Sequence, residues 1–308
     1  MKAWVLGGPT ASGKTAVAHL IAKEWNAVVL CADAMAVYRG LDIGTAKPDR
    51  TMRAAVSYFG IDLVDPCQTF SAGEFVRAAR DAAEEASRQG RPLIVVGGSG
   101  LYISAVVLGL DASPSDPAKR AEWEILYRDG GVEKLQAALQ ALDPHAFESL
   151  SDPRNPRRLI RALERAASGQ PSPRAWAVRG GLSPICVLRR NPVDLRARIW
   201  FRAREMVENG LIEEARRLRA EYPGLSATAR HAIGYAEAYS VLDGQLSEEE
   251  AIQAIARRTW RLARRQMTWF RHQLPATWID IHPEESPEAV ADRVRRAWEE
   301  HGPVDLHV

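Results

Sequence analysis

Residues 8–15 of this 308-residue chain have the sequence of a phosphate-binding loop. They match the pattern G-x-x-x-x-G-K-[ST] and follow a short apolar run at residues 3–6 that is typical of a strand. Glycines let consecutive backbone N–H groups turn toward a diphosphate, Lys14 adds a positive charge, and the Thr15 hydroxyl can ligate Mg²⁺ at the start of the next helix. We therefore expect Mg²⁺ as a cofactor and a diphosphate-binding segment of Gly8, Pro9, Thr10, Ala11, Ser12, Gly13, Lys14 and Thr15.

Two polar residues, Asp33 and Ser99, each follow an apolar run that predicts a strand, at residues 27–31 and 93–96. Asp33 could ligate a metal ion or water, accept a proton as a general base, or only cap the turn that follows it. Ser99 lies in a Gly-Gly-Ser-Gly segment and could donate a hydrogen bond to a leaving oxygen, or the segment could be a structural turn. Both residues are therefore candidates for chemistry beside the phosphate loop.

One feature separates the chain from most nucleotide kinases and hydrolases with this loop, in which a second apolar strand ends in an Asp that helps to hold Mg²⁺. Here the run at residues 93–96 ends in Gly97 and Gly98 instead. This difference weakens the interpretation as an ATPase, although the loop alone does not decide between a nucleotide and another phosphorylated ligand. The pair Asp62 and Asp65 is a single D-x-x-D, which we interpret as part of a loop.

The first hundred residues alternate between strand and helix patterns. A helix is expected at residues 71–89, opened by a capping box of Ser71 with Glu74 three residues later. Strands that alternate with helices form a parallel sheet, and ligands bind such sheets at the carboxyl ends of the strands. We therefore expect the phosphate loop, Asp33 and Ser99 to meet at one edge of the sheet.

From about residue 111 the pattern becomes helical. A turn-rich linker at residues 112–117 precedes helical patterns at residues 118–127, 132–142 and 157–167. The last of these ends in a turn-rich segment at residues 168–173. This part of the chain is expected to be an all-helical insertion.

A short strand at residues 185–188 is expected to return the chain to the sheet, and the remainder is expected to be helical. Its last long helix should run from a capping box of Ser247 and Glu250 to about residue 272, with a shorter helix at residues 287–301. The predicted fold class is α/β, with a P-loop NTPase-like parallel sheet core, an all-helical insertion domain and a helical C-terminal region. The predicted domains are residues 1–110, 111–180 and 181–308.

The composition is that of a soluble globular enzyme. Hydrophobic residues make up 46% and charged residues 26% of the chain, and no apolar run reaches the ~20 residues that cross a bilayer. Met1 leads directly into the first predicted strand, so no signal peptide is expected. Three scattered cysteines predict neither a disulfide nor a zinc site. We expect a cytoplasmic protein with no membrane partner.

The formal net charge of +2 conceals two basic blocks. Residues 151–180 hold seven arginines against two acidic residues, a local net charge of +5, and residues 251–279 hold six arginines and no acidic residue. The second block is interleaved with Trp260, Trp269 and Phe270. Such a block is usually a solvated helix face, but two of them in a nearly neutral chain favour a polyanion such as RNA as a partner.

In these residues and in further motifs, the chain resembles the bacterial tRNA dimethylallyltransferase family, whose members prenylate N6 of the adenosine next to the anticodon. The resemblance extends from about Val5 to Arg271. It rests on the phosphate loop, on Asp33 with VYRGLDIGTAKP at 37–48, on VGGSGLY at 96–102, and on four shorter segments: RALE at 161–164, IGY at 233–235 with Glu237, RRQ at 264–266 and TWF at 268–270.

The resemblance implies dimethylallyl diphosphate, rather than ATP, on the phosphate loop. It implies that Lys14 and Arg202 stabilise the departing diphosphate, that Asp33 is the base facing the adenine amine, and that Ser99 occupies the place of a Thr at the reacting centre. It also implies that the insertion and the basic C-terminal helices grip the anticodon stem-loop of a tRNA, and we expect a monomer. The residues implied to contact tRNA are Asp33, Ala34, Met35, Ala36, Ser99, Arg120, Arg157, Arg158, Leu159, Ile160, Arg161, Arg264, Arg265 and Gln266.

The chain departs from the family pattern at several positions. Ala34 and Ala36 stand where the family commonly has Ser and Gln, and Trp260 replaces an Arg of the last basic helix. These changes leave Lys14, Thr15, Asp33 and the hydroxyl at position 99 in place. We therefore expect the chemistry to be retained, while the departures bear on RNA selectivity.

Two other classes of protein could contain the same loop. One is a small-molecule enzyme, either a nucleotide kinase or a prenyltransferase of free adenine nucleotides, which would have little use for an insertion with a local charge of +5. The other is a non-catalytic RNA-binding protein whose loop only senses a phosphorylated ligand. The joint presence of Lys14, Asp33 and Ser99 argues against the second class.

Overall fold

The computed structural model describes residues 1–109, 116–169 and 183–308. The chain forms two compact units, the first of Met1–Leu110 with Val178–Val308 and the second of Asp111–Ala177, which interrupts the first along the sequence. Most of the predicted linker (residues 112–115) and the end of the predicted insertion (residues 170–180), which includes the basic-block residues Arg174 and Arg179, lie outside the described residues.

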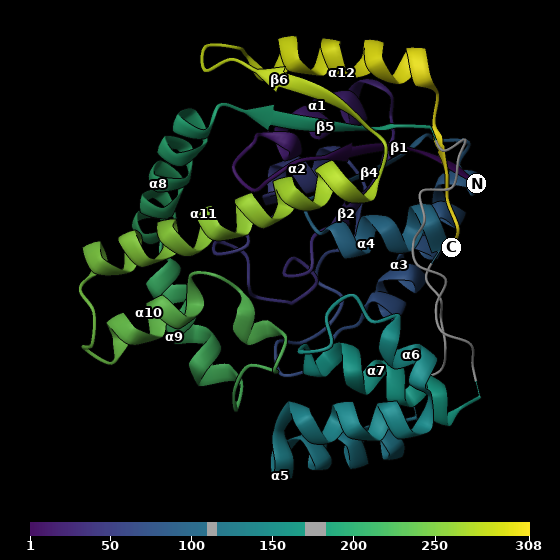
Figure 1. Cartoon of the computed structure of the whole chain (residues 1–308). Coiled ribbons are helices and arrows are strands. Elements are labelled where there is room, and N and C mark those ends of the chain that lie inside the picture. The colour runs from purple at the N-terminus through teal and green to yellow at the C-terminus, as the bar shows by residue number, and fades with distance from the viewer. Residues whose placement is uncertain (110–115, 170–182) are drawn as a thin grey trace. The chain divides into compact units, whose positions relative to one another are not determined.

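The first unit is built on a mostly parallel sheet, shown in Figure 1, with the strand order β3-β2-β4-β1-β5-β6. A short seventh strand, β7, pairs antiparallel with β1. The α/β fold class is therefore confirmed. The strands are β1 (Lys2–Gly7), β2 (Val28–Ala32), β3 (Tyr58–Phe59), β4 (Leu93–Gly97), β5 (Ile185–Arg190), β6 (Ala276–Ile281) and β7 (Val304–Asp305).

The register of the central strands brings three strand ends into line. Gly97 at the end of β4 pairs with Gly7 of β1 on one side and with Ala32 of β2 on the other. The next residues of these strands therefore lie at one edge of the sheet, and they open the phosphate loop, the Asp33 turn and the Ser99 segment. This is the arrangement expected from the alternation of strands and helices.

Helices cover the sheet on two sides. The helix α1 (Lys14–Glu24) packs with α12 (Pro287–His301), and their apolar faces, which include Trp298 of α12, share a core cluster with Leu6 of β1. Figure 1 shows α3 (Ala72–Arg88) on the side opposite to α12. The chain then continues through β4 into α4 (Gly100–Ser104) and the π-helical turn η1 (Ala105–Gly109). The predicted capping box of Ser71 and Glu74 at the start of α3 is confirmed.

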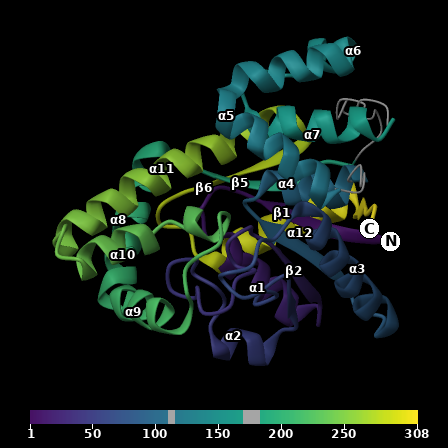
Figure 2. The ribbon, with the colours of Figure 1, turned by 90° about the horizontal axis from the view of Figure 1, so that it is seen from below.

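The chain after β5 contains helices that gather beyond the carboxyl end of that strand (Figures 1 and 2). Two of them, α8 and α11, pack together through an apolar cluster that also holds Ala11 of the phosphate loop. The predicted capping box at the start of α11 is confirmed. The bounds are α8 (Pro192–Glu208), α9 (Leu211–Glu221), α10 (Tyr235–Leu242) and α11 (Glu248–Gln273), with the short elements α2 (Arg50–Ala55) before β3 and η2 (Ala229–His231) before α10.

The expectation that everything after the 185–188 strand is helical is wrong, because β6 and β7 are strands. In β6, six consecutive residues pair in parallel with β5, from Ile185 with Ala276 to Arg190 with Ile281. This segment is short, and the backbone pairing that defines it is made with a strand about ninety residues earlier. Local sequence patterns do not record such a pairing.

The regular secondary structure in the described part of the second unit, residues 116–169, is helical. It contains α5 (Pro117–Leu142), α6 (Pro144–Glu148) and α7 (Pro156–Ala167). The backbone of α5 is non-helical at Gly130 and Gly131, which divides it into two helical stretches where two separate helices are predicted. Its core is a cluster of side chains from α5, α6 and α7: Leu135, Leu139, Ala146, Leu159, Ile160 and Leu163. In the part of the chain that the structure describes, no helix has both the length and the apolar character that crossing a bilayer requires.

Candidate active site at the carboxyl edge of the sheet

The phosphate loop forms the turn between β1 and α1. Gly13, directly before the first residue of α1, has φ of +96°, a left-handed conformation that favours glycine. Because α1 begins at Lys14, its first backbone N–H groups have no partner within the helix and are available to an anion. The hydroxyl of Ser12 within the loop is buried and has no hydrogen-bond partner among the described residues. These features fit a loop that receives phosphate oxygens.

Side chains from distant parts of the chain hold the loop backbone. The Nε of Arg190 at the end of β5 donates to Ser12 O at 3.0 Å, and Nε of Arg198 on α8 donates to Ala11 O at 3.1 Å. From α11, Gln266 accepts the backbone N–H of Thr10 through its Oε1 at 2.8 Å. The conformation of the loop is thus fixed before any ligand binds, which reduces the entropic cost of binding.

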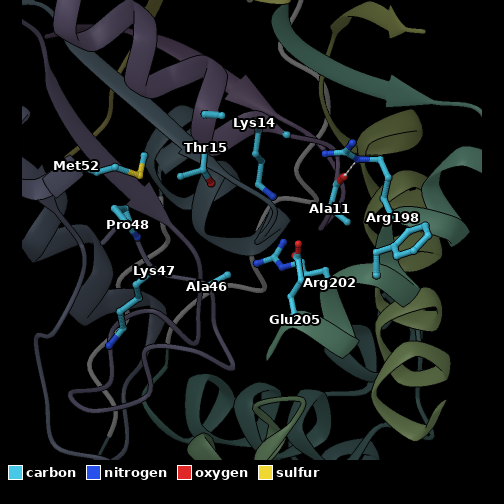
Figure 3. Close-up of a pocket in the computed structure, with 13 residues that line it drawn as sticks. Ala11, Lys14, Thr15, Ala46, Lys47, Pro48, Met52, Arg198, Arg202 and Glu205 are labelled. Atoms are coloured by element: carbon cyan, nitrogen blue, oxygen red, sulfur yellow. Dashed lines mark hydrogen bonds between the residues drawn. The ribbon is translucent and has the colours of Figure 1, made fainter. Parts of the chain in front are cut away.

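A cavity of about 450 Å³ opens beside the loop (Figure 3). Lys14 and Thr15 line it from the start of α1, and Arg198 and Arg202 line it from α8. In Figure 3, Lys14 and Arg202 extend toward the same space. The rest of the lining comes from the loop and α1 (Ala11, Gly13, Ala16), from the segment before and within α2 (Ala46, Lys47, Pro48, Met52) and from α8 (Phe201, Glu205).

The electrostatics of this cavity favour an anion. Burial lowers the pKa of Lys14 to about 8, the carboxylate of Asp33 opposes this shift, and the nearby Arg202 adds to it. Burial also lowers the pKa of both Arg198 and Arg202. Lys14 and Arg202, two partly buried cations close to each other, are destabilised until a negative charge joins them.

Asp33 and Ser99 are both oriented by consecutive backbone amides. The N–H of Met35 donates to Oδ1 of Asp33, and the N–H of Ala34 donates to Oγ of Ser99, each at 2.9 Å. The N–H of Ser99 in turn donates to Ala32 O at 3.1 Å. The turn role considered for Asp33 is therefore present, and it leaves the second carboxylate oxygen available. Since Oγ of Ser99 accepts the Ala34 N–H, its own hydrogen remains available to donate.

Glycines at this edge allow α11 to pack directly on the strand ends. A Cβ on Gly98 would lie 2.4 Å from Nε2 of Gln266, and a Cβ on Gly100 would lie 2.1 Å from the Trp269 ring. A Cβ on Gly7 would similarly meet the ring of Phe270 at 2.6 Å. Gly98 and Gly100 are therefore required by the packing of α11, and Ser99 between them stays at the edge.

The segment at residues 42–48, which contributes to the cavity wall, is held by two buried polar groups. Nζ of Lys47, whose side chain is only 1% exposed, donates to Asp42 at 2.7 Å and to Asp62 at 2.5 Å. On the other side, Glu214 accepts the N–H of Ile43 and the hydroxyl of Tyr235. These contacts give Asp62 the loop role that its spacing indicated.

Several residues implied to contact tRNA lie on helix surfaces. Arg264 and Arg265 are exposed on α11. In the second unit, Arg120 pairs with Glu124 at 3.0 Å, Arg161 pairs with Glu164 at 3.1 Å, and Arg158 donates to Ser151. Arg157 lies beside Arg158 in the first turn of α7.

Four other residues of the implied tRNA set have side chains that face the protein. Leu159 and Ile160 are 0% and 6% exposed in the core of the second unit, and Ala36 is 2% exposed in the first. The expectation that these three side chains contact RNA needs correction, because apolar burial has already removed them from the surface. Gln266 holds the phosphate loop, as described above.

Arg190 and Arg198, which fix the loop backbone, were not expected from the sequence. A signal was present, because Asp194, Arg198 and Arg202 recur every four residues and so share one face of α8. Asp194 pairs with Arg190 at 2.8 Å, which orients that guanidinium toward the loop. The contribution of Arg190 itself depends on the pairing of β5 with β1.

Any Mg²⁺ at this site would have few protein ligands. The described ranges contain no group of three or more His, Cys, Asp or Glu side chains that could hold a metal ion. The hydroxyl of Thr15 lies on the cavity, next to the loop that would present phosphate oxygens. This donor set fits Mg²⁺, which binds through one or two protein ligands together with substrate phosphates.

A parallel sheet whose carboxyl edge gathers a phosphate loop, an oriented carboxylate and a hydroxyl defines an α/β protein with a site at this edge that is suited to a phosphorylated ligand. Comparison with known proteins identifies its family. The chain belongs to the IPP transferase family, whose sequence model matches residues 36–273. The resemblance seen in the motifs is therefore confirmed.

Individual relatives agree with this assignment. The chain is 41% identical over 302 residues to a tRNA dimethylallyltransferase of Anaeromyxobacter dehalogenans, and the match covers 96% of this chain and 100% of the relative. A solved tRNA isopentenylpyrophosphate transferase of Bacillus halodurans is similar with a TM-score of 0.67 and 36% identity, and the match covers 97% of both chains. A eukaryotic dimethylallyltransferase solved while acting on tRNA shares the fold, with a TM-score of 0.74, 20% identity and coverage of 97% of this chain and 76% of that one.

Proposed function

We propose that this protein transfers a dimethylallyl group from dimethylallyl diphosphate to N6 of adenosine 37, beside the anticodon of a tRNA, and releases diphosphate. Membership of the IPP transferase family and the dimethylallyltransferase relatives support the reaction class. The observation that supports it most directly is the joint presence, at one sheet edge, of a cationic phosphate loop and the oriented side chains of Asp33 and Ser99.

The leaving group is stabilised by the loop. Cleavage of the bond between C1 and oxygen in an allylic diphosphate gives an allyl cation and places negative charge on the diphosphate, so neutralising that charge lowers the barrier. Lys14 and Arg202 supply positive charge, the first N–H groups of α1 donate hydrogen bonds, and Ser99 donates its free hydrogen to the departing oxygen.

Bound Mg²⁺ would add further neutralisation of the diphosphate, as a Lewis acid. Thr15 is the residue that would hold it, together with oxygens of the substrate. The cavity position of the Thr15 hydroxyl supports this assignment.

The nucleophile requires a base and close positioning. The exocyclic amine of adenine is a poor nucleophile because its lone pair is delocalised into the ring, so N6 must be held near C1 of the allyl group and must lose a proton. The free oxygen of Asp33 accepts that proton as the bond between N6 and C1 forms. Since a stacked base cannot reach this edge, the adenosine must turn out of the anticodon loop, and water must be excluded from the allyl cation.

The RNA is bound by basic helix surfaces. Arg157, Arg158 and Arg161 on α7, Arg120 on α5 and Arg264 and Arg265 on α11 are the proposed contacts with the anticodon stem-loop. All the proposed chemical groups come from one unit of one chain, which supports action as a monomer.

The proposal is tested by incubating the protein with dimethylallyl diphosphate, Mg²⁺ and unmodified tRNA and analysing the digested nucleosides by mass spectrometry. We expect adenosine that is heavier by one dimethylallyl group, at a single position, and no product when the diphosphate is omitted. Prenylation of free adenine nucleotides without modification of tRNA would contradict the proposal and favour the small-molecule enzyme instead.

A further inference from the structure

One side chain links the two strand-end segments on which the proposed reaction depends. Gln266 of α11 accepts the backbone N–H of Thr10 in the phosphate loop at 2.8 Å. Its Nε2 lies against Gly98, where an added Cβ would come within 2.4 Å, and Gly98 directly precedes Ser99. The same carboxamide therefore touches the segment after β1 that would hold the diphosphate and the segment after β4 that presents the hydroxyl.

The neighbouring residues of α11 make this link rigid. Trp269 and Phe270 pack on Gly100 and Gly7, one turn further along the helix. Phe270 is 1% exposed, so this part of α11 is anchored in the core. A glutamine held by such an anchor keeps its carboxamide at one place relative to both segments.

We propose that Gln266 is a positioning residue. It holds the phosphate loop and the Ser99 segment at a fixed separation, so that diphosphate bound on the loop is correctly placed relative to the Ser99 hydroxyl. This inference rests on the proposed function and deepens it. Gln266 acts through the Thr10 N–H and the Gly98 backbone. Its role therefore differs from the RNA contact that the family resemblance implies for it.

The test compares Gln266→Met, which keeps the volume and removes the acceptor, with Gln253→Met as a matched control at an exposed position of the same helix. Calorimetry with Mg²⁺ and inorganic diphosphate should show about tenfold weaker binding for Gln266→Met, the loss expected when a hydrogen bond that orders a site is removed. Binding of an anticodon stem-loop RNA without diphosphate should stay within about twofold in both variants.

Amide hydrogen exchange provides a local measurement that general destabilisation would not reproduce. Exchange in residues 8–13 should accelerate in Gln266→Met, while exchange in β4 stays unchanged. If Gln266→Met fails to fold, Gln266→Glu serves instead, because its carboxylate can still accept the Thr10 N–H. In that variant the loop amides should remain protected even if the added charge weakens diphosphate binding.

Unchanged diphosphate affinity with unchanged loop exchange in Gln266→Met would overturn the positioning role. So would unprotected loop amides in a folded Gln266→Glu. Loss of RNA binding with intact diphosphate binding would instead assign Gln266 to the RNA interface. Because these measurements need no turnover, they remain informative if the wild-type protein fails to prenylate tRNA, an outcome that would count only against the proposed function.

Discussion

The orientation of Asp33 and Ser99 depends on backbone rather than on neighbouring side chains. Two successive amides, those of Ala34 and Met35, hold the hydroxyl and the carboxylate. Replacing Ser and Gln of the family pattern by Ala34 and Ala36 removes side chains, but it leaves these amides in place. The orientation of Asp33 and Ser99 therefore does not depend on the side chains at positions 34 and 36.

Substitution of Asp33 by Asn distinguishes between two roles of this residue, a catalytic base and a residue that only stabilises the turn. Asn keeps an oxygen that accepts the Met35 N–H, so folding, diphosphate binding and tRNA binding should be nearly unchanged, while single-turnover transfer should slow by roughly 10²-fold or more because the proton has no acceptor. Ser99→Ala should also slow transfer, whereas Ser99→Thr should remain active. Near-normal transfer by Asp33→Asn would mean that the proton leaves to the diphosphate or to water.

The lowered pKa of Lys14 predicts a dependence of binding on pH. With a pKa of about 8 in the free protein, Lys14 loses its proton above this pH, whereas bound diphosphate favours the charged form. Diphosphate affinity should therefore fall above about pH 8, by up to tenfold per pH unit, and binding should take up close to one proton. Calorimetry in buffers of different ionisation enthalpy measures this uptake.

The same shift affects stability with a defined sign. Because the unfolded chain keeps its Lys14 proton up to the ordinary value of 10.5, the free protein should gain stability from this group as the pH rises between about 8 and 10.5. Lys14→Met provides the control for both effects, since it removes the titrating group. A Lys14→Met variant that retained the proton uptake would assign the titration to another residue.

At the scale of elements, α7 and α11 each have one face for packing and another face for solvent. On α7, Leu159 and Leu163 fill the core of the second unit, while Arg157 and Arg158 are exposed. On α11, Phe270 and Ala263 are buried within the first unit, while Arg264 and Arg265 are exposed. Exposed arginines placed in this way supply positive charge without taking part in the apolar packing of either helix.

Neutral replacement of Arg157, Arg158 and Arg161 together tests whether α7 contacts RNA phosphates. Binding of tRNA should weaken, and its salt dependence should flatten by roughly one unit of slope for each phosphate contact that is lost. A triple replacement of Arg77, Arg80 and Arg88, all exposed on α3, makes the same change in net charge and serves as the control. An equal salt slope in the two triple variants would identify the α7 arginines as a solvated face.

At the scale of the whole chain, the site is assembled from segments far apart in sequence. The loop at residues 8–15 receives contacts from Arg190, Arg198 and Gln266, which are between about 180 and 260 residues away. A ligand that fills this site should therefore stabilise the entire first unit, because α8, α11 and the sheet all contribute to it.

The protection that each ligand gives against thermal unfolding ranks the candidate substrates by affinity. Dimethylallyl diphosphate should raise the unfolding temperature more than ATP at equal concentration, because protection grows with concentration relative to Kd. Omission of Mg²⁺ should reduce the protection, since the diphosphate then lacks the ion that Thr15 would help to hold. Stronger protection by ATP would support a nucleotide kinase.

The sequence by itself determined the local chemistry and most of the elements. The loop pattern, the capping boxes at Ser71 and Ser247, and the alternation of strands and helices are all set by interactions within a few residues, so they can be read from short segments. The resemblance of motifs also indicated the family. These predictions depended on spacing along the chain.

The tertiary structure decided which residues meet. Whether Leu159 and Ile160 face RNA or a core, whether residues 276–281 form a strand, and whether Gln266 reaches Thr10 each depend on contacts between segments separated by tens to hundreds of residues. Such contacts arise when apolar faces and strand edges find partners elsewhere in the chain, and local propensity does not encode the partner. For this reason Lys14 and Asp33 could be identified from sequence, while Arg190 and Arg198 became visible only in the folded chain.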